Sequence, residues 1–280
     1  MKRVLAPTLP TRERPVHLAE SEADHLTRVL RLRDGDVIEA LDGHGHAALV
    51  TLRIKGGGPR IEFLEGAEQS VRTAGVTIPG ATPVDLEMAI LKGDAMEWVV
   101  EKAVELGVRK LYPAVTAHTV VQIRNKGPEA FRDRWQKIAD QALKQCGRLD
   151  KMEVALPLSL EELLSTHPAT LDQPRLWFDE AGKDESAYLA NWLGAQDMQK
   201  LSSVKLLVGP EGGWSSQERD LLIASSRVSP IHRLGLGPWI LRGETAALLS
   251  VSLTTARFRS LGLSESSDMS LDKTLTTKGS

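Results

Sequence analysis

Two glycine-rich turns in the second half of the chain each carry charged residues with few side chains around them. In the first, residues 206–218, an apolar run stops at Gly-Pro and Glu211 stands between glycines. In the second, residues 234–247, a Gly-x-Gly-Pro turn is followed by Arg242 and Glu244. A carboxylate can accept or orient a proton, and a guanidinium can stabilise a developing anion. Because glycines let another molecule approach the backbone closely, both turns are candidate sites.

The two carboxylates also have a structural interpretation. Glu211 can accept hydrogen bonds from backbone donors of its turn, and Glu244 can stabilise a helix N-terminus, where negative charge is favourable. Two common nucleotide-binding motifs are excluded. Gly235 and Gly237 begin a dinucleotide fingerprint, but Pro238 follows and no third glycine has the required spacing. Neither turn contains the Gly-Lys-Ser/Thr of a P-loop.

The elements that must position these residues are a strand and a helix on either side of the first turn. An apolar run, residues 206–208, enters the turn. Ser215 and Glu218 then occupy the N-cap and N3 positions of a capping box. A buried strand that ends in a glycine turn before a helix is where open α/β sheets bind ligands.

Strands and helices alternate over residues 84–263, which predicts an α/β domain with a mostly parallel sheet. We expect strands at residues 84–91, 110–115, 153–156, 175–179 and 206–208. We expect helices after Asp94 (an N-cap, with Glu97 at N3), around Phe131 and Trp135, after Ser159, at 187–193, after Ser215, and at 244–258.

The sequence pattern of residues 1–72 predicts a small β-barrel instead of an α/β domain. Short apolar stretches at 37–41, 47–52 and 61–64 are separated by turn residues such as Asp-Gly and Gly-Gly-Gly-Pro. A short helix precedes them at residues 22–30, with an arginine cluster close behind. We expect residues 73–83 to be a linker and the Ser/Thr-rich residues 264–280 to be a disordered tail.

The composition excludes several classes of protein. The net charge of −2 means that any contact with nucleic acid has to come from local basic patches. The single cysteine excludes an internal disulfide framework and a multi-cysteine metal site, and it fits a reducing compartment. The sequence contains no apolar run long enough to span a membrane and no signal-peptide pattern. The expected location is the cytoplasm.

The two glycine turns together carry a more specific signal. The pair LVGPEGGWSSQE and LGLGPWILRGETAA resembles the bacterial 16S rRNA uridine N3-methyltransferase family, of the SPOUT (knotted) methyltransferase superfamily. Residues 95–108 are similar to the family's EKATELGV segment, and residues 134–148 to its RW and EQCGR segments. Residues 25–36 resemble its N-terminal PUA-like RNA-binding barrel. The similarity covers roughly residues 15–260.

The resemblance implies that the chain threads a trefoil knot and that S-adenosylmethionine binds between the two glycine turns. It also implies a homodimer in which both subunits help to build the site. It implies a 16S rRNA or 30S-subunit substrate and no metal, because S-adenosylmethionine is itself an activated methyl donor. The implied cofactor-binding residues are Leu207, Val208, Gly209, Pro210, Glu211, Gly212, Gly213, Leu234, Gly235, Leu236, Gly237, Ile240 and Leu241.

The chemistry that the resemblance implies needs removal of a proton from uracil N3 and in-line placement of the methyl group. Arg242 would hold a uracil carbonyl and stabilise the developing anion, while Glu211 or Glu244 would orient Arg242 or relay the proton. The candidate RNA-binding residues are His25, Arg28, Arg31, Arg33, Arg148 and Trp239. The chain departs from the family at Trp239, which is commonly Arg, at Gly243, commonly Thr, and at Lys144, usually Glu.

Two other functions stay open at this point. One is a methyltransferase of the same superfamily with a different base or RNA as its target. The other is an RNA-binding protein that keeps the fold without catalysis, although such a protein has no need to keep both glycine turns open.

Overall fold

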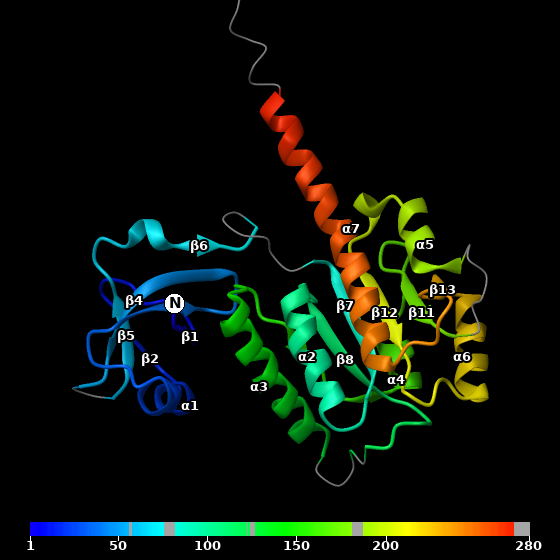
Figure 1. Cartoon of the computed structure of the whole chain (residues 1–280), viewed down its shortest axis with the longest axis horizontal. Coiled ribbons are helices and arrows are strands. Elements are labelled where there is room, and N and C mark those ends of the chain that lie inside the picture. Colours follow the sequence, from blue (N-terminus) through cyan, green and yellow to red (C-terminus); the bar gives the residue numbers. More distant parts are fainter. Residues whose placement is uncertain (56–57, 76–81, 122, 124–126, 181–186, 272–280) are drawn as a thin grey trace, which may run out of the picture. The chain divides into compact units, whose positions relative to one another are not determined.

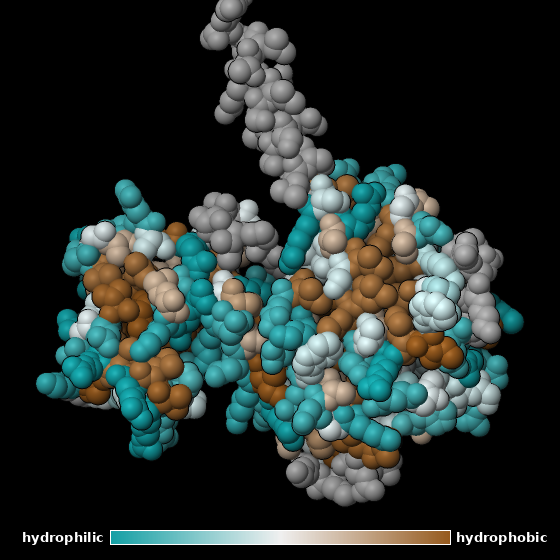
Figure 2. Space-filling view, viewed as in Figure 1, coloured by the Kyte–Doolittle hydropathy of each residue, from teal (hydrophilic) through white to brown (hydrophobic). Residues whose placement is uncertain are grey.

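The computed structural model of the chain describes residues 1–55, 58–75, 82–121, 123, 127–180 and 187–271 (Figure 1). Contacts divide the chain into two compact units. The first comprises residues 1–81 together with 137–152, and the second comprises 82–136 and 153–280. On the face shown in Figure 2, hydrophobic patches interrupt a largely hydrophilic surface. None of the described helices combines the length and the apolar character that a membrane span requires.

The first unit is built on a curled, mostly antiparallel sheet. Its strands run in the order β1-β3-β4-β5-β2, and β6 pairs with β4. Leu26, Ile38, Leu52 and Ile61 are fully buried in its core. The strands are β1 (Arg3–Leu5), β2 (Val16–His17), β3 (Val37–Leu41), β4 (His46–Arg53), β5 (Arg60–Phe63) and β6 (Arg72–Thr73). Sequence patterns predict β3, β4 and β5, whereas β1, β2 and β6 are too short to show a period.

The expected helix at residues 22–30 is two segments in the structure. The α-helix α1 (Glu20–Asp24) continues directly as a π-helical turn, η1 (His25–Val29). Arg31 follows with a φ of 53°, and it is the one non-glycine residue of the described chain with a positive φ. A 3-10 turn, η2 (Glu68–Ser70), lies between β5 and β6.

The domain boundary differs from the expected one because the last part of α3 (Pro128–Cys146) belongs to the barrel unit. The Arg3 guanidinium donates to the carbonyl oxygens of Lys144 and Gln145, each at 2.9 Å. The ammonium of Lys144 lies 2.5 Å from the carboxylate of Glu22. Lys144, expected to be a departure from the family's pattern, therefore forms an ion pair between α3 and the barrel.

The second unit is built on a parallel sheet, as the strand and helix alternation predicts. Its strands run in the order β10-β8-β7-β12-β11-β13, and β9 pairs with β8; every pairing is parallel. The strands are β7 (Val84–Ala89), β8 (Lys110–Val115), β9 (Glu153–Val154), β10 (Leu158–Ser159), β11 (Arg175–Phe178), β12 (Val204–Val208) and β13 (Ile231–Leu234).

Helices cover both faces of this sheet. The helices α2 (Asp94–Leu106) and α7 (Gly243–Leu271) pack together over β7 and β12 (Figure 1). On the other face, α4 (Leu160–Thr166) and α6 (Ser216–Ser226) bury leucines against Trp177 and Leu207. The short α5 (Leu189–Ala195) contacts α7, and a 3-10 turn, η5 (Met198–Lys200), precedes β12.

Both predicted capping boxes of the serine type are present. Ser159 with Glu162 starts α4, and Ser215 with Glu218 starts α6. The prediction for Asp94 is wrong: the N-cap of α2 is Gly93, with a φ of 54°, and Glu97 forms an ion pair with Arg134. A glycine can adopt this φ without strain, so the turn after β7 takes the place of a side-chain cap.

The chain beyond residue 263 also differs from the expected tail. The last helix, α7, continues to Leu271, well past the predicted end at residue 258. Residues 272–280 lie outside the described part of the chain. The same is true of residues 76–81, which make up most of the expected linker at 73–83.

Candidate active site

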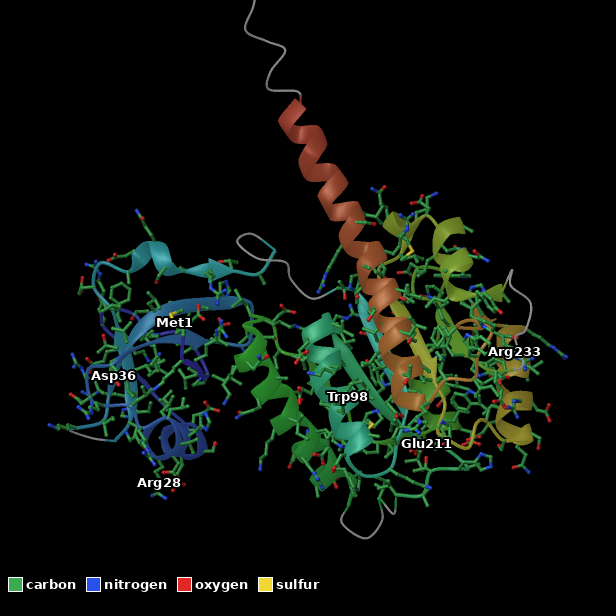
Figure 3. The ribbon with its side chains drawn as sticks, viewed as in Figure 1. Met1, Arg28, Asp36, Trp98, Glu211 and Arg233 are labelled. Atoms are coloured by element: carbon green, nitrogen blue, oxygen red, sulfur yellow. The ribbon has the colours of Figure 1, made fainter. Side chains whose placement is uncertain are left out.

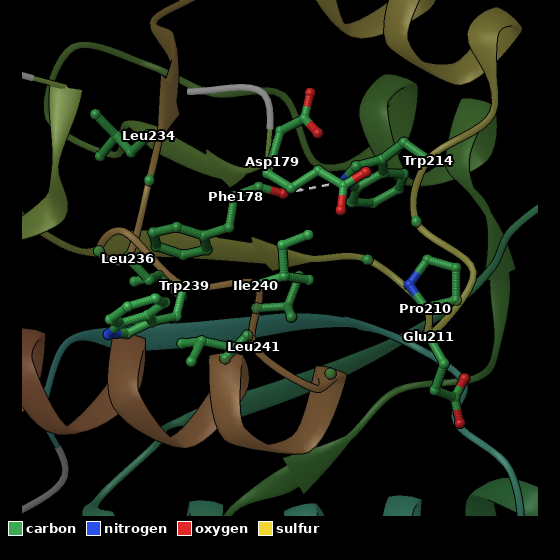
Figure 4. A pocket seen from close by; sticks show the side chains of 18 of the residues that line it. Phe178, Asp179, Pro210, Glu211, Trp214, Leu234, Leu236, Trp239, Ile240 and Leu241 are labelled. Carbon is green, nitrogen blue, oxygen red and sulfur yellow. Dashed lines mark hydrogen bonds between the residues drawn. The ribbon is translucent and has the colours of Figure 1, made fainter. Parts of the chain in front are cut away.

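A pocket of about 850 Å³ opens at the carboxyl ends of β11, β12 and β13 (Figure 4). Three parallel strands end at this edge of the sheet, and the loops that follow them leave on the same side. This edge is the usual ligand position in open α/β sheets. Its wall consists of Phe178, Asp179, Glu180, Tyr188, Val208, Gly209, Pro210, Glu211, Gly213, Trp214, Leu234, Gly235, Leu236, Gly237, Pro238, Trp239, Ile240, Leu241, Gly243 and Ala246.

The glycines of the first turn are required by the protein's own packing. A Cβ atom on Gly209 would lie 2.9 Å from the indole of Trp214, which is buried and donates from Nε1 to the carbonyl of Phe178 at 2.9 Å. A Cβ atom on Gly212 would lie 3.0 Å from the Cβ of His118. Gly213 alone in this turn has a positive φ, of 69°. Each of these three positions therefore requires glycine for a different structural reason, namely packing against Trp214, packing against His118 or a positive φ.

Hydrogen bonds from two neighbouring loops hold the first turn. The exposed carboxylate of Glu211 accepts the backbone N–H of Lys92, at 3.1 Å, from the loop between β7 and α2. The Nδ1 atom of His118, in the loop after β8, lies 2.8 Å from the carbonyl oxygen of Gly213. Glu218 also accepts the backbone N–H of Ala117, at 2.8 Å, in that loop. The first turn is thus fixed before any ligand arrives.

Among the described residues, the backbone of the second turn is hydrogen-bonded at its beginning and at the start of α7. The backbone N–H of Gly235 donates to Ala187, and its carbonyl accepts from Leu189. From Leu236 to Leu241, no backbone N–H or C=O makes a hydrogen bond with another described residue. The residues that carry these groups line the pocket and are exposed or half-buried, so a ligand can reach them. The second turn therefore offers backbone donors and acceptors to a ligand, such as the edge of a purine base.

The chain then returns from the edge of the sheet to its centre. Gly243 lies against Leu91 and the carbonyl of Gly209, where a Cβ atom would be 2.9 Å from the Leu91 side chain. This glycine, where the family commonly has Thr, lets α7 begin directly beneath the first turn. A path that passes back under an earlier turn is the one that the knotted resemblance predicts.

Arg242 and Glu244 flank this crossing. The Arg242 side chain is exposed and forms no ion pair with any described residue, while its neighbours Leu241 and Gly243 line the pocket. Glu244 lies in the first turn of α7, where a negative charge is favoured by the helix dipole. A guanidinium without a partner beside a pocket is available to an anionic or carbonyl group of a substrate.

Sequence reasoning missed the third segment of the pocket wall, the end of β11. Asp179 has a side chain that is 1% exposed, and two arginines meet it: Arg219 at 3.3 Å and Arg233 at 2.5 Å. Phe178 and Glu180 line the pocket on either side of it. The signal was present, because a strand was predicted at 175–179 and its carboxyl end belongs to the same edge of the sheet as the two glycine turns.

Eleven of the thirteen expected cofactor-binding residues line the pocket, and two do not. Leu207 is fully buried on the opposite face of the strand, in the cluster around Trp177. Gly212 is covered by His118. Trp239, expected to contact RNA, belongs to the pocket mouth with Ile240, and their exposed fractions are 79% and 81%.

The other candidate RNA-binding residues belong to the barrel unit. Arg28 extends from the helical segment into solvent, with Asp24 at 3.2 Å (Figure 3). Arg31 and Arg33 are exposed, and His25 is half-buried. Arg148 differs: its side chain is 8% exposed and lies 3.0 Å from Asp150. Its guanidinium is not presented to solvent, so the structure gives no support to an RNA contact there.

Comparison with known families decides the general class. Residues 79–255 match the model of an RNA methyltransferase domain. The chain belongs to this RNA methyltransferase family. Residues 18–57 match the PUA domain of RNA methyltransferases, which agrees with the expected barrel.

Individual relatives agree with the family. The chain is 31% identical to a Bacillus subtilis protein named ribosomal RNA small subunit methyltransferase E, over 82% of this chain and 86% of the relative. A Synechocystis protein of the same name is 28% identical, over 89% and 75%.

Solved structures of the family share the fold. The Neisseria gonorrhoeae ribosomal RNA small subunit methyltransferase E, bound to S-adenosyl methionine, has a TM-score of 0.74 at 25% identity and covers 91% of this chain and 97% of its own. A putative methyltransferase of Legionella pneumophila, in complex with the same cofactor, has a TM-score of 0.71 at 25% identity, with coverage of 91% and 96%.

Proposed function

We propose that this RNA methyltransferase transfers the methyl group of S-adenosylmethionine to N3 of a uridine in 16S ribosomal RNA. The observation that carries the proposal is the pocket between the two glycine turns, with its row of backbone groups from Leu236 to Leu241 that have no partner among the described residues. Relatives named as small-subunit rRNA methyltransferases, and family structures that hold the cofactor, support it.

The pocket fits S-adenosylmethionine in its chemistry. The apolar side chains of Phe178, Leu236 and Leu241 suit a planar base, and the free backbone groups of the second turn suit its polar edge. When bound, S-adenosylmethionine supplies an electrophilic methyl group, so the protein has to orient the base and remove a proton.

In this proposal Arg242 holds a uracil carbonyl and stabilises the negative charge that develops as N3 loses its proton. Its lack of an ion pair in the described chain leaves it available for that contact. Glu244, two residues further along the chain, would orient the guanidinium or relay the proton. The carboxylate of Glu211 accepts the backbone N–H of Lys92, and no ion pair joins it to Arg242 in the described chain.

The barrel unit would bind the RNA. Its residues Arg28, Arg31 and Arg33 supply exposed positive charge for phosphates. In the second unit, Trp239 at the pocket supplies an aromatic face for a splayed base. A homodimer and a cytoplasmic location complete the proposal. The exposed hydrophobic side chains of Trp239 and Ile240 at the pocket mouth are suitable for burial against RNA or a second copy of the chain.

The test is methylation of 30S subunits and of naked 16S rRNA, both from cells that lack the modification, followed by nucleoside mass spectrometry. N3-methyluridine supports the proposal. A different methylated nucleoside would move the enzyme to another target, and S-adenosylmethionine binding without any methyl transfer would favour the non-catalytic alternative.

Arg242→Ala sharpens the same test. We expect turnover to fall by roughly 10²–10³-fold, as for loss of one group that stabilises a developing anion, while calorimetry shows nearly unchanged cofactor affinity. Arg227→Ala is the matched control, because Arg227 is an exposed arginine at the end of α6 and does not line the pocket. If cofactor binding collapses in Arg242→Ala, the residue belongs to the cofactor site.

A further inference from the structure

The charged residues in the described wall of the pocket are all acidic, and they differ in how their charge is compensated. Asp179 is matched by two arginines, Arg219 and Arg233. Glu180 lies 3.7 Å from Arg219, a longer distance than that of a direct hydrogen bond. The carboxylate of Glu211 has no cationic partner among the described residues; the group that it bonds is the neutral N–H of Lys92.

This arrangement leaves a negative charge at the rim of the pocket. Glu211 follows Pro210 at the edge of the pocket in Figure 4, with its carboxylate toward the loop after β7. A neutral donor fixes the position of a carboxylate without cancelling its charge. Charges at the wall of a cleft act on a bound ion more strongly than the same charges in open solvent, because the protein excludes part of the water.

We propose that Glu211, with a smaller contribution from Glu180, lets the pocket distinguish the methyl donor from its demethylated product by charge. The inference rests on the proposed function. S-adenosylmethionine carries a sulfonium, an ammonium and a carboxylate, which sum to one positive charge. The product, S-adenosylhomocysteine, has a neutral thioether in place of the sulfonium and sums to zero.

Methyl transfer removes the attraction between the carboxylate of Glu211 and the sulfonium, because it removes the positive charge on sulfur. The lone pair of uracil N3 forms the new N–C bond, the C–S bond breaks, and its electron pair returns to sulfur. The proton of N3 leaves to a base and then to solvent. A donor that was attracted to Glu211 thereby becomes a product that is not, which favours release of the product.

Glutamine at position 211 separates this role from a structural one. Its side-chain oxygen can still accept the N–H of Lys92, and its shape is that of glutamate, so Glu211→Gln removes the charge and keeps the turn. The three ligands to compare are the donor, the product, and a stable donor analogue that carries a protonated amine in place of the sulfonium. The analogue separates the effect of charge from that of the extra methyl group.

The experiment is calorimetric titration of the full chain with each ligand at about 0.05 M and about 0.5 M salt, because salt screens exposed charges. In Glu211→Gln we expect the donor and the amine analogue to bind about fivefold more weakly at low salt, an effect typical of one partly screened charge, and the product to change by less than about twofold. Glu180→Gln should show the same pattern with a smaller change, since Arg219 lies near that carboxylate.

Asp220→Asn is the matched control, because it removes an exposed negative charge on α6 that does not line the pocket. Equal weakening of donor and product in Glu211→Gln, or no change in either, overturns the inference and leaves the proposed function standing. A wild-type chain that binds none of the three ligands overturns the proposed function instead.

Discussion

The two ends of the parallel sheet differ in their backbone polar groups, although each holds a buried and paired carboxylate, Glu87 at one end and Asp179 at the other. Where β11 begins, Arg175 donates two hydrogen bonds, at 2.6 and 2.8 Å, to Glu87 in the middle of β7, and both side chains are almost completely buried. The ammonium of Lys205 in β12 donates to the carbonyls of His167 and Pro168. At the other edge of the sheet, beyond the end of β13, the backbone from Leu236 to Leu241 has no partner in the described chain.

The difference separates stability from binding within one sheet. A buried charge is tolerated only when it is paired, so the beginning of the strands is a closed network that specifies how they align. The open backbone groups at the other end belong to exposed or half-buried residues, so water can satisfy them until a ligand takes its place. We therefore expect changes at the first end to unfold the unit and changes at the second to affect binding.

Glu87→Gln should have the largest effect on stability. It leaves the guanidinium of Arg175 buried without a counter-charge, and breaking one partner of a buried pair costs about 3–5 kcal/mol. Urea denaturation would measure the loss in free energy of unfolding. The control is Glu153→Gln, because Glu153 pairs with Lys110 but its side chain is 64% exposed, and such pairs contribute about 0–1 kcal/mol. Equal effects of the two variants would contradict the distinction between the buried pair and the exposed pair.

Gly209→Ala should affect both properties. The new methyl group would meet the indole of Trp214 at 2.9 Å, and displacing it breaks the bond to Phe178. Overpacking of this kind costs about 1–3 kcal/mol, and the displaced indole would enter the pocket and weaken cofactor binding. Thermal unfolding and calorimetry would measure the two effects.

The matched control for Gly209→Ala is Gly194→Ala. Gly194 lies in α5 with open space around its Cβ position, so we expect unchanged or slightly higher stability there and unchanged binding. A Gly209→Ala variant as stable and as tight in binding as this control would show that Trp214 can relax without consequence.

The sequence predicted one end of the sheet better than the other. Glycine turns, capping boxes and a family resemblance led to the pocket, whose wall contains eleven of the thirteen residues expected to bind the cofactor. Nothing in the sequence pairs Glu87 with Arg175, because they are 88 residues apart and their contact depends on strand order. The chain at the end of β11, residues 178–180, contains no glycine, so its place at the pocket follows only from the direction that it shares with β12 in the parallel sheet.

Sequence patterns predicted the structure correctly where the contact joins residues that are close together in the chain. Ser159 and Ser215 cap helices as predicted because the capping bonds span three residues. Asp94 matches the same pattern, yet Gly93 takes the cap, since the chain after β7 turns through a positive φ. The barrel unit's share of α3 depends on Arg3 and Glu22, contacts more than 120 residues apart in sequence, and no local pattern contains them.

The smallest expected effect is the pH dependence of stability at the closed end. Burial lowers the pKa of His167 below its ordinary value of about 6.5, an effect that nearby Lys205 and Arg175 reinforce and Glu87 opposes. The unfolded chain therefore binds more protons than the folded one just below pH 6.5, so stability rises with pH across that window. The contribution is present above about pH 6.5 and is lost as the pH falls through the lowered pKa.

His167→Phe tests this contribution because it keeps the ring contact with Tyr112, whose centroid is 4.6 Å away, and removes the titration. Urea denaturation between about pH 5 and pH 7, above the range in which ordinary carboxylates titrate, should give a flatter profile for the variant than for the wild type. Burial lowers the pKa of His232 in β13 as well, so His167→Phe/His232→Phe should be flatter still. A wild-type profile that falls with rising pH would reverse the sign and place a protonated histidine in the folded network.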